Sequence, residues 1–318
     1  MAQQGTSSTR SFRSSTRRHL NRFLFDSYEL GEIQDQTSPA VILPKDDYRT
    51  IHAAKTLGLH NGDTIRAGLV SDSETDEPGR LTDSATIEWI PEGKVKKAEP
   101  LGNGDPPGSL QITLDNLQEP PASDQLSVSL ILALPRPLQL GRMLPMISQL
   151  GVDQLVLTGA RKVPKDYFGS HLFRKPHALR ERLVEGLCQA GDVRLPKVHV
   201  AKQLRFFLED DLETMFPREE YARVIAHPRR ANDPTEPLRM GDIVFPGESG
   251  ASNKPARVVL AVGPEGGWQE PGELDTFQSL GFQQVTLGTR TLRSDCAVVN
   301  LMGLANEVCY QKNKERRL

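Results

Sequence analysis

From about residue 126 onward, apolar strand-like runs alternate with helical stretches, and no other pattern in the chain limits its fold as strongly. Parallel strands need a crossover between them, and an unbroken apolar run is typical of a strand that is covered on both faces. The alternation therefore predicts an α/β fold, with a mainly parallel sheet and helices on both faces. The predicted strands read LSVSLILAL, QLVLTGA, KVHVA, YARVIAH, RVVLAV and QQVTLG.

The first part of the chain has a different pattern of apolar and polar residues. Residues 18–117 contain short strand-like runs, one helical stretch at 45–59, and polar loops rich in Pro and Gly. Mostly strands with a single helix predicts a small β-barrel domain. The proline-containing segment 118–125 is predicted to be a linker, so residues 126–318 form the second domain.

Composition narrows the class of protein. The 318 residues are 37% apolar and 25% charged, with a net charge of −2, which is typical of a globular protein. No run approaches the roughly 18 apolar residues that a spanning helix needs, so we expect no membrane association. The chain has three cysteines and no CxxC motif, which favours a reducing compartment. We expect Cys296 and Cys309, on the predicted last helix, to be packed thiols.

The basic N-terminal segment leaves two interpretations open. Residues 1–25 hold five arginines, many Ser and Thr, and no acid. This composition is found in organelle transit peptides and also in flexible basic tails. We expect a flexible tail over residues 1–17 and a cytoplasmic protein, with organelle targeting as the alternative.

Two loops that each follow a predicted strand indicate a ligand pocket. RVVLAV runs into the glycine-rich turn GPEGG at 263–267, and QQVTLG runs into Gly288 and the loop TRTLRSD. In open α/β sheets, ligands bind beyond the carboxyl ends of the strands, and glycines let the backbone come close to them. Together the loops could hold the edge of an adenine and a ribose; taken alone, GPEGG is equally consistent with a tight turn. The chain has neither GxGxxG nor GxxxxGK[ST], which disfavours a dinucleotide or a nucleoside triphosphate.

Three longer segments carry a resemblance to a known family. They read VGPEGGWQEPGELDTFQSLGFQQVTLGTRTLRSDCA, QLGVDQLVLTGARK and EGLCQAGDVRLPKV. The chain resembles the RsmE family of small-subunit rRNA methyltransferases over nearly all of residues 18–311. The resemblance implies a SPOUT-type trefoil-knotted catalytic domain, a PUA-like RNA-binding barrel over residues 18–117, and a homodimer. It also implies S-adenosylmethionine as the cofactor, no metal, and 3-methyluridine in small-subunit rRNA as the product.

Arg293 and Asp295 are the predicted catalytic residues. Methylation of uridine N3 requires the loss of a proton, and a cation beside O2 or O4 stabilises the anion that forms. We assign the cation to Arg293 and expect Asp295 to orient it or to assist proton removal. The structural alternative for Arg293 is a surface ion pair with Asp295. For Asp295 it is a helix N-cap before Cys296, which we expect in either case and which does not exclude function.

The predicted cofactor pocket is formed by residues at the ends of three predicted strands. His227 ends a third strand and is expected only to line the pocket, and Glu265 is expected near the sulfonium or bonded to backbone amides. The predicted cofactor-binding residues are His227, Val262, Gly263, Pro264, Glu265, Gly266, Gly267, Leu287, Gly288, Arg290, Leu292, Arg293 and Ser294.

A basic cluster at 160–183 is the predicted RNA surface, together with the first domain. It holds seven Lys or Arg residues against two acids. Structured rRNA is bound through phosphates and shape, although such clusters also serve merely as solvated helix faces. The expected partner is small-subunit rRNA or the assembled small subunit. The predicted RNA-binding residues are Arg18, Arg22, Arg161, Lys162, Arg174 and Lys175.

Three other functions stay open at the level of sequence. The chain could be an RNA-binding or ribosome-assembly factor that keeps the fold without turnover. It could also methylate a different RNA base, with altered contacts at Gln149, Asp192 and Asp295. A metabolic enzyme on a similar sheet is the weakest alternative, because it would need neither the barrel nor the basic cluster.

Overall fold

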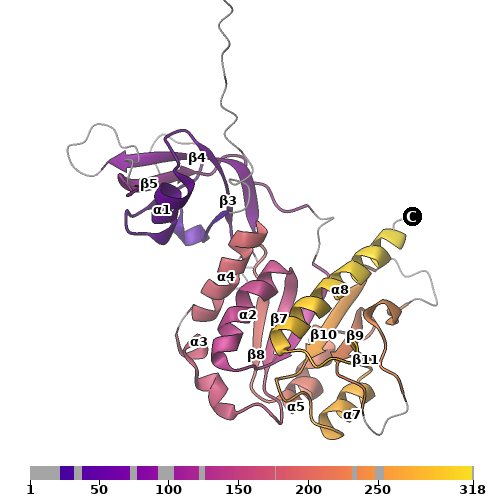
Figure 1. Cartoon of the computed structure of the whole chain (residues 1–318). Helices are drawn as coiled ribbons and strands as arrows, with labels where there is room; N and C mark the ends of the chain where they lie inside the picture. Colours follow the sequence, from indigo (N-terminus) through magenta and orange to yellow (C-terminus); the bar gives the residue numbers. More distant parts are fainter. Residues whose placement is uncertain are drawn as a thin grey trace, which may run out of the picture. The chain divides into compact units, whose positions relative to one another are not determined.

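The structure is a computed structural model of the chain, and it describes residues 22–31, 38–71, 77–91, 104–121, 126–175, 177–230, 235–247 and 254–316. The chain divides into two compact units (Figure 1). The first comprises the described residues of Met1–Leu69, Arg80–Gln118 and Cys188–Gly191. The second comprises those of Val70–Gly79, Glu119–Leu187 and Asp192–Leu318. The predicted tail at 1–17 and the second half of the predicted linker, residues 122–125, lie outside the described residues.

The first unit is built on a five-stranded sheet in the order β1-β3-β4-β5-β2. Side chains alternate between buried and more exposed along β5, as expected for a sheet with one covered face. Among the described strands, β1 and β2 are the two ends of the sheet, so the unit is a half-barrel and its PUA-like character stays a prediction. The strands are β1 (Phe23–Phe25), β2 (Ala40–Leu43), β3 (Thr64–Leu69), β4 (Arg80–Pro91) and β5 (Gly108–Thr113).

The helical stretch predicted at 45–59 is shorter than expected. It consists of α1 (Tyr48–His52) followed by a π-helical turn, η3 (Ala53–Leu57). The Asp47 carboxylate caps the start by accepting from the Arg49 N–H, and Gly58 ends the segment in the left-handed conformation at φ 58°. A short 3₁₀ turn, η2 (Ser27–Glu29), follows β1.

The second unit contains a six-stranded sheet in the order β11-β9-β10-β6-β7-β8, and every pairing in it is parallel. The predicted parallel α/β sheet is therefore confirmed, whereas the trefoil knot stays a prediction. All six residues of β6 are buried, so the sheet is covered on both faces at its centre. The strands are β6 (Val128–Ala133), β7 (Val152–Thr158), β8 (Lys197–Ala201), β9 (Tyr221–Ala226), β10 (Arg257–Val262) and β11 (Gln283–Val285).

Two long helices, α2 (Pro137–Gln149) and α8 (Ser294–Glu315), pack against each other and against strands of this sheet (Figure 1). Pro137 lies at the first position of α2, where its missing N–H costs no helical hydrogen bond. No helix among the described residues is long and apolar enough to cross a membrane. The remaining helical segments are η5 (Lys165–Gly169), α3 (His171–Arg174), α4 (Ala178–Ala190), α5 (Leu204–Phe206), η6 (Phe207–Asp211), α6 (Leu212–Met215), η7 (Met240–Asp242) and α7 (Gly272–Ser279).

The two cysteines of α8 have opposite surroundings. Cys309 is buried, and burial raises the pKa of its thiol to about 12. Cys296 is exposed in the first turn of the helix. The prediction of a packed thiol is therefore confirmed for Cys309 and wrong for Cys296, because the helix turns that side chain away from the core.

Candidate active site

The carboxyl ends of the parallel strands bring the two predicted loops to one edge of the sheet. His227, directly after β9, donates its backbone N–H to the Val285 carbonyl of β11 at 3.1 Å. On its other side, a Cβ atom added to Gly267 would lie 3.8 Å from His227 Cε1. The loop after β10 and the loop after β11 therefore both adjoin His227, as the strand order requires.

Glycine geometry shapes the turn at 263–267. Gly267 donates its N–H to the Pro264 carbonyl at 2.8 Å and has φ +67°, a left-handed conformation that favours glycine. Gly263 is buried, and a Cβ there would approach the Trp268 backbone nitrogen to 3.1 Å. The predicted tight turn is therefore present, and it leaves Glu265 and Gly266 exposed at its tip.

Hydrogen bonds to two neighbouring loops hold this turn in place. Lys162, after β7, donates from Nζ to the Gly266 carbonyl at 2.8 Å and to the Trp268 carbonyl at 3.2 Å. The Glu265 carboxylate accepts the backbone N–H of Arg136 at 3.2 Å, which fits its predicted bond to a backbone amide. Lys162, predicted to contact RNA, thus braces the GPEGG turn through its ammonium group.

His227 is also fixed on its side-chain face. Its Nε2 lies 2.9 Å from Glu270 Oε1, and its side chain is only 9% exposed. Glu270 was not predicted as part of the site, although it follows the glycine turn by only three residues. The imidazole therefore lines the space between the loops rather than standing at the surface.

The loop after β11 is braced by its own side chains. Thr286 Oγ1 accepts the Gly288 N–H at 3.2 Å and donates to the Gly288 carbonyl at 3.1 Å. Gly288 has φ +121°, a conformation that L side chains rarely adopt. Of the other predicted residues, Val262, Pro264 and Ser294 are buried, Leu287 is half-buried, and Arg290, Leu292 and Arg293 are exposed.

Arg293, Asp295 and Gln139 form a closed triangle of hydrogen bonds. Arg293 Nη2 donates to Asp295 Oδ2 at 3.0 Å and to Gln139 Oε1 at 3.1 Å. Gln139 Nε2, on α2, donates to the same Asp295 oxygen at 2.6 Å. The arrangement leaves the Arg293 side chain 71% exposed, so its guanidinium is oriented but still reachable by a substrate.

Asp295 is held as an anion. Burial acts to raise its pKa, but the Cys296 backbone N–H, the Gln139 amide and the Arg293 charge outweigh this, so the pKa of Asp295 lies below its ordinary value. The N-cap position of α8 is Arg293, not Asp295 as predicted. Asp295 lies inside the first turn, where its carboxylate accepts the Cys296 N–H at 2.9 Å.

Gln139 and Arg136 were not predicted, because nothing around them in the sequence marks them. Gln139 lies 154 residues from Arg293 in the chain and 156 from Asp295. Only the packing of α2 against α8 brings it to the site. A motif search restricted to neighbouring residues has no means of finding such a contact.

The predicted RNA-binding residues fall into different environments. Arg22 is only 3% exposed, and its guanidinium donates to the carbonyls of Ala67 and Thr82 and to Asp83. The prediction that Arg22 contacts RNA is therefore wrong: the arginine belongs to the interior of the first unit. Arg18 lies outside the described residues.

Three other predicted RNA-binding residues, all in the cluster at 160–183, are at the surface. Arg161 and Lys175 are exposed, as is Arg174, whose Nε donates to the Gly169 carbonyl. The backbone N–H of Arg161 donates to Glu273 at 2.7 Å. Their contact with RNA stays a prediction.

The chemistry of the loops can be compared with that of S-adenosylmethionine, which carries no phosphate. The turn at 263–267 and the loop after β11 offer backbone polar groups, and Glu265 and Glu270 offer carboxylates. A Cβ built on Gly267 would meet His227 Cε1 at 3.8 Å, an ordinary contact distance, so the imidazole bounds this face of the turn. In the part of the chain that the structure describes, no three His, Cys, Asp or Glu side chains cluster closely enough to hold a metal ion.

Comparison with known sequences identifies the second unit. The family described as an RNA methyltransferase domain matches residues 122–306. Ribosomal RNA small subunit methyltransferase E of Treponema pallidum is 29% identical over 195 residues, which are 59% of this chain and 65% of that protein. The chain thus spans just under two thirds of this relative's length. The protein of the same name from Mesomycoplasma hyopneumoniae is 40% identical over 50 residues, 16% of this chain and 22% of that one.

Solved structures share the fold over about nine tenths of the chain. Ribosomal RNA small subunit methyltransferase E from Neisseria gonorrhoeae, bound to S-adenosyl methionine, aligns with a TM-score of 0.60 and 20% identity over 91% of this chain and 98% of that one. A probable rRNA-methyltransferase from Porphyromonas gingivalis aligns with a TM-score of 0.61 and 18% identity over 92% and 100%. The family match, together with a fold shared along nearly the full length, confirms what the resemblance in sequence predicted: the chain belongs to the RNA methyltransferase domain family.

Proposed function

We propose that this protein is an S-adenosylmethionine-dependent methyltransferase that acts on N3 of a uridine in small-subunit rRNA. The observation that carries the proposal is the triangle of Arg293, Gln139 and Asp295, which starts directly after the loop of β11. It presents an oriented, exposed cation at the edge of the sheet where the glycine-rich turn lies. The methyltransferase relatives from Treponema pallidum and Neisseria gonorrhoeae support the same reading.

The cofactor would be held by the three loops that meet at His227. The turn at 263–267 and the loop ending at Gly288 would supply backbone contacts to the adenine and the ribose, with His227 lining the wall between them. When bound, S-adenosylmethionine supplies a methyl group on a positively charged sulfur atom. Lys162 and Arg136 keep the turn in the shape that this contact requires.

Arg293 has a defined task in this reaction. For N3 to accept the methyl group, its proton would have to leave, and the proton would pass to solvent. The Arg293 guanidinium stabilises the negative charge that spreads onto the uridine O2 and O4 when that proton leaves. Asp295 has a lowered pKa and is therefore a weak base, so its part is to orient Arg293 rather than to remove the proton.

The other features of the proposal follow the resemblance to the RsmE family. The loops at the sheet edge would belong to a SPOUT-type trefoil knot, and the half-barrel would be a PUA-like RNA-binding domain. The protein would work as a homodimer in the cytoplasm on small-subunit rRNA or on the assembled subunit. The exposed Arg161, Arg174 and Lys175 would contact phosphates.

The proposal predicts a labelled nucleoside and a residue-specific loss. Purified protein is incubated with small ribosomal subunits, or with their rRNA, and isotopically labelled S-adenosylmethionine, and nucleosides are analysed by mass spectrometry. We expect labelled 3-methyluridine from the wild type. Removing an oriented charge of this kind typically lowers turnover about 100-fold or more, so we expect that loss for Arg293→Ala while the cofactor Kd stays within a few-fold.

The matched control is Arg218→Ala, an exposed arginine that precedes β9 and so lies at the opposite edge of the sheet. It should keep wild-type turnover. Equal turnover of Arg293→Ala would remove Arg293 from the mechanism, and a different labelled base would keep the pocket but replace the substrate. Cofactor binding without any label in RNA would favour a binding or assembly factor instead.

A further inference from the structure

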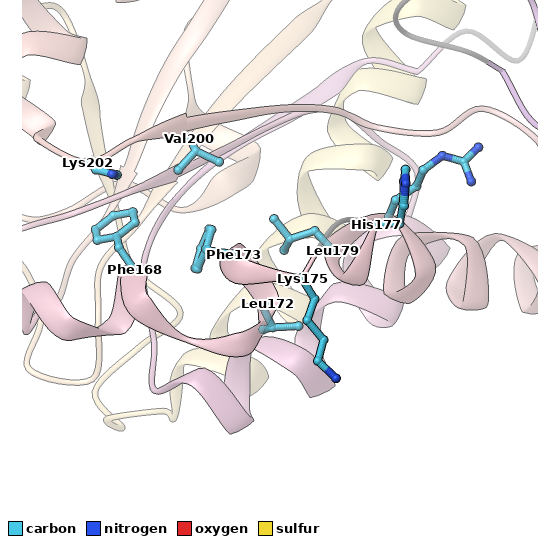
Figure 2. A pocket seen from close by; sticks show the side chains of 9 residues that line it. Phe168, Leu172, Phe173, Lys175, His177, Leu179, Val200 and Lys202 are labelled. Carbon is cyan, nitrogen blue, oxygen red and sulfur yellow. The ribbon is translucent and has the colours of Figure 1, made fainter.

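A cavity lies beside the edge strand β8, three places from β10 in the strand order. It has a volume of about 480 Å³, within the range of pockets that bind small molecules. Its lining residues lie in or next to η5, α3, the start of α4 and the edge strand β8. Figure 2 shows their side chains. The lining residues are Phe168, Leu172, Phe173, Lys175, His177, Leu179, Arg180, Val200 and Lys202.

The cavity combines aromatic rings with positive charge. Phe168 and Phe173 are half-buried, with ring centroids 5.5 Å apart, and Figure 2 shows the rings next to each other. The lining includes two lysines and one arginine and no acid, and both lysines are exposed. Aromatic faces stack on nucleobases, and lysines attract the phosphates that link them. A purely apolar ligand would leave this set of charges without a counterpart.

The wall formed by β8 also lacks the cover that the centre of the sheet has. Val200 is 40% exposed and Val198 38%, whereas every residue of β6 is buried. Among the described strands β8 pairs only with β7, so it is an edge of the sheet. The exposed apolar surface therefore continues from the cavity along this edge. This is expected of a binding surface and not of a packing gap beside the core.

The cavity adjoins the candidate active site through a short path of contacts. Gly159, after β7, donates its N–H to the Ala201 carbonyl at the end of β8 at 3.3 Å. A Cβ built on Gly159 would lie 2.5 Å from the Lys202 carbonyl and 3.6 Å from a ring carbon of Phe168. Three residues further along, Lys162 donates to the Gly266 carbonyl. Cavity and glycine-rich turn are thus joined along one loop at the carboxyl edge of the sheet.

We propose that this cavity binds a nucleotide of the RNA strand that flanks the target uridine. One base stacks against the Phe168–Phe173 pair, and Lys175 and Lys202 contact the phosphates on either side of it. The inference rests on the proposed function, because it takes RNA as the substrate. It adds a second point of attachment, which holds the strand while the target base reaches Arg293.

Binding of a fluorescein-labelled single-stranded oligouridylate, measured by anisotropy over a series of salt concentrations, tests the inference in the full chain. For single strands, the slope of log K against log[salt] changes by about 0.7 per phosphate contact. Lys175→Gln combined with Lys202→Gln should therefore flatten the slope by about 1.4. The matched control, Lys175→Arg with Lys202→Arg, keeps both charges and should keep the slope.

The aromatic part is tested by Phe173→Leu, which keeps an apolar side chain against the core. Loss of stacking should lower the affinity roughly tenfold and leave the salt slope unchanged. The lysine variants keep the test valid if Phe173→Leu does not fold, because both lysines are exposed.

Four results would overturn the inference. The first is no measurable RNA binding by the wild type, and the second is an unchanged salt slope in the Gln variants. The third is that free uridine 5′-monophosphate competes for the site as well as the oligouridylate does. The fourth is that the variants change the sedimentation of the protein and leave its affinity for RNA unchanged. The third result would indicate a free-nucleotide site and the last an interface between copies of the chain. Binding is measured without methyl transfer, so a wild type that binds RNA at this cavity but forms no methylated nucleoside refutes the proposed function alone.

Discussion

At the scale of single residues, the candidate active site depends on one amide. Gln139 accepts from Arg293 with its oxygen and donates to Asp295 with its nitrogen, so it fixes both charged groups from a different helix. Without it, the Arg293 guanidinium would have Asp295 as its remaining partner in the triangle and would sample more orientations. Gln139 is thus a positioning residue for Arg293.

Gln139→Ala should lower turnover roughly tenfold, which corresponds to the loss of hydrogen bonds to charged groups, with little change in the cofactor Kd. It also removes one cause of the lowered pKa of Asp295, so that pKa rises. The Arg293–Asp295 pair is intact above the pKa of Asp295 and is lost as the pH falls through it. The acid limb of a pH–rate profile should therefore move to higher pH. Gln278→Ala, an exposed glutamine of α7, is the control, and a profile that does not move would contradict the assignment.

At the scale of elements, α2 and α4 pack through a contact that only glycine permits. A Cβ added to Gly186 of α4 would lie 2.1 Å from the Pro145 carbonyl oxygen and 2.2 Å from Ser148 Oγ of α2. Ser148 Oγ also donates to the Leu183 carbonyl at 2.7 Å, which keeps the two helices in register. Any side chain at 186 would collide with the backbone of α2 and force the two helices apart.

Gly186→Ala should therefore lower the free energy of unfolding by about 2 kcal/mol, the usual cost of overpacking a core. The same substitution at Gly303 of α8, where a new Cβ would meet nothing within 4 Å, is the control. It should stabilise the protein by up to about 1 kcal/mol, because alanine favours a helix over glycine. Urea unfolding measures both; equal changes at the two sites would contradict the packing argument.

The strands were easier to predict than the contacts between elements. The apolar runs that form β6 and β10 are buried on both faces, so their composition alone predicted that they are interior strands of the sheet. Arg22, by contrast, was predicted to face RNA from its charge and is instead buried against carbonyls of the first unit. The burial of Arg22 depends on strands that are distant in the sequence, so the composition around Arg22 could not predict it.

At the scale of the whole molecule, each unit has its own apolar core and its own tryptophan. Trp89 belongs to the core of the first unit and Trp268 to that of the second, and both are almost fully buried. They are the two tryptophans of the sequence. Fluorescence can therefore report on each unit separately.

Trp89→Phe leaves Trp268 as the reporter of the second unit, and Trp268→Phe leaves Trp89 as the reporter of the first. We expect S-adenosylmethionine, at 100 times its Kd, to stabilise the unit that binds it by about 2.7 kcal/mol. The urea midpoint reported by Trp268 should rise, and that reported by Trp89 should not. A joint shift of both midpoints would show that the units unfold together, and no shift of either would contradict a cofactor site in the second unit.

The position of β10 between β6 and β9 has a consequence for how the chain is made. β10 follows both of its neighbours in the sequence. During synthesis it is therefore the last of the interior strands to be made, although it lies in the middle of the sheet. Until then β6 and β9 each present an open, apolar strand edge, which invites pairing with other chains. The newly made protein thus passes through a period of greatest exposure to aggregation that ends when residues 257–262 insert and close the sheet.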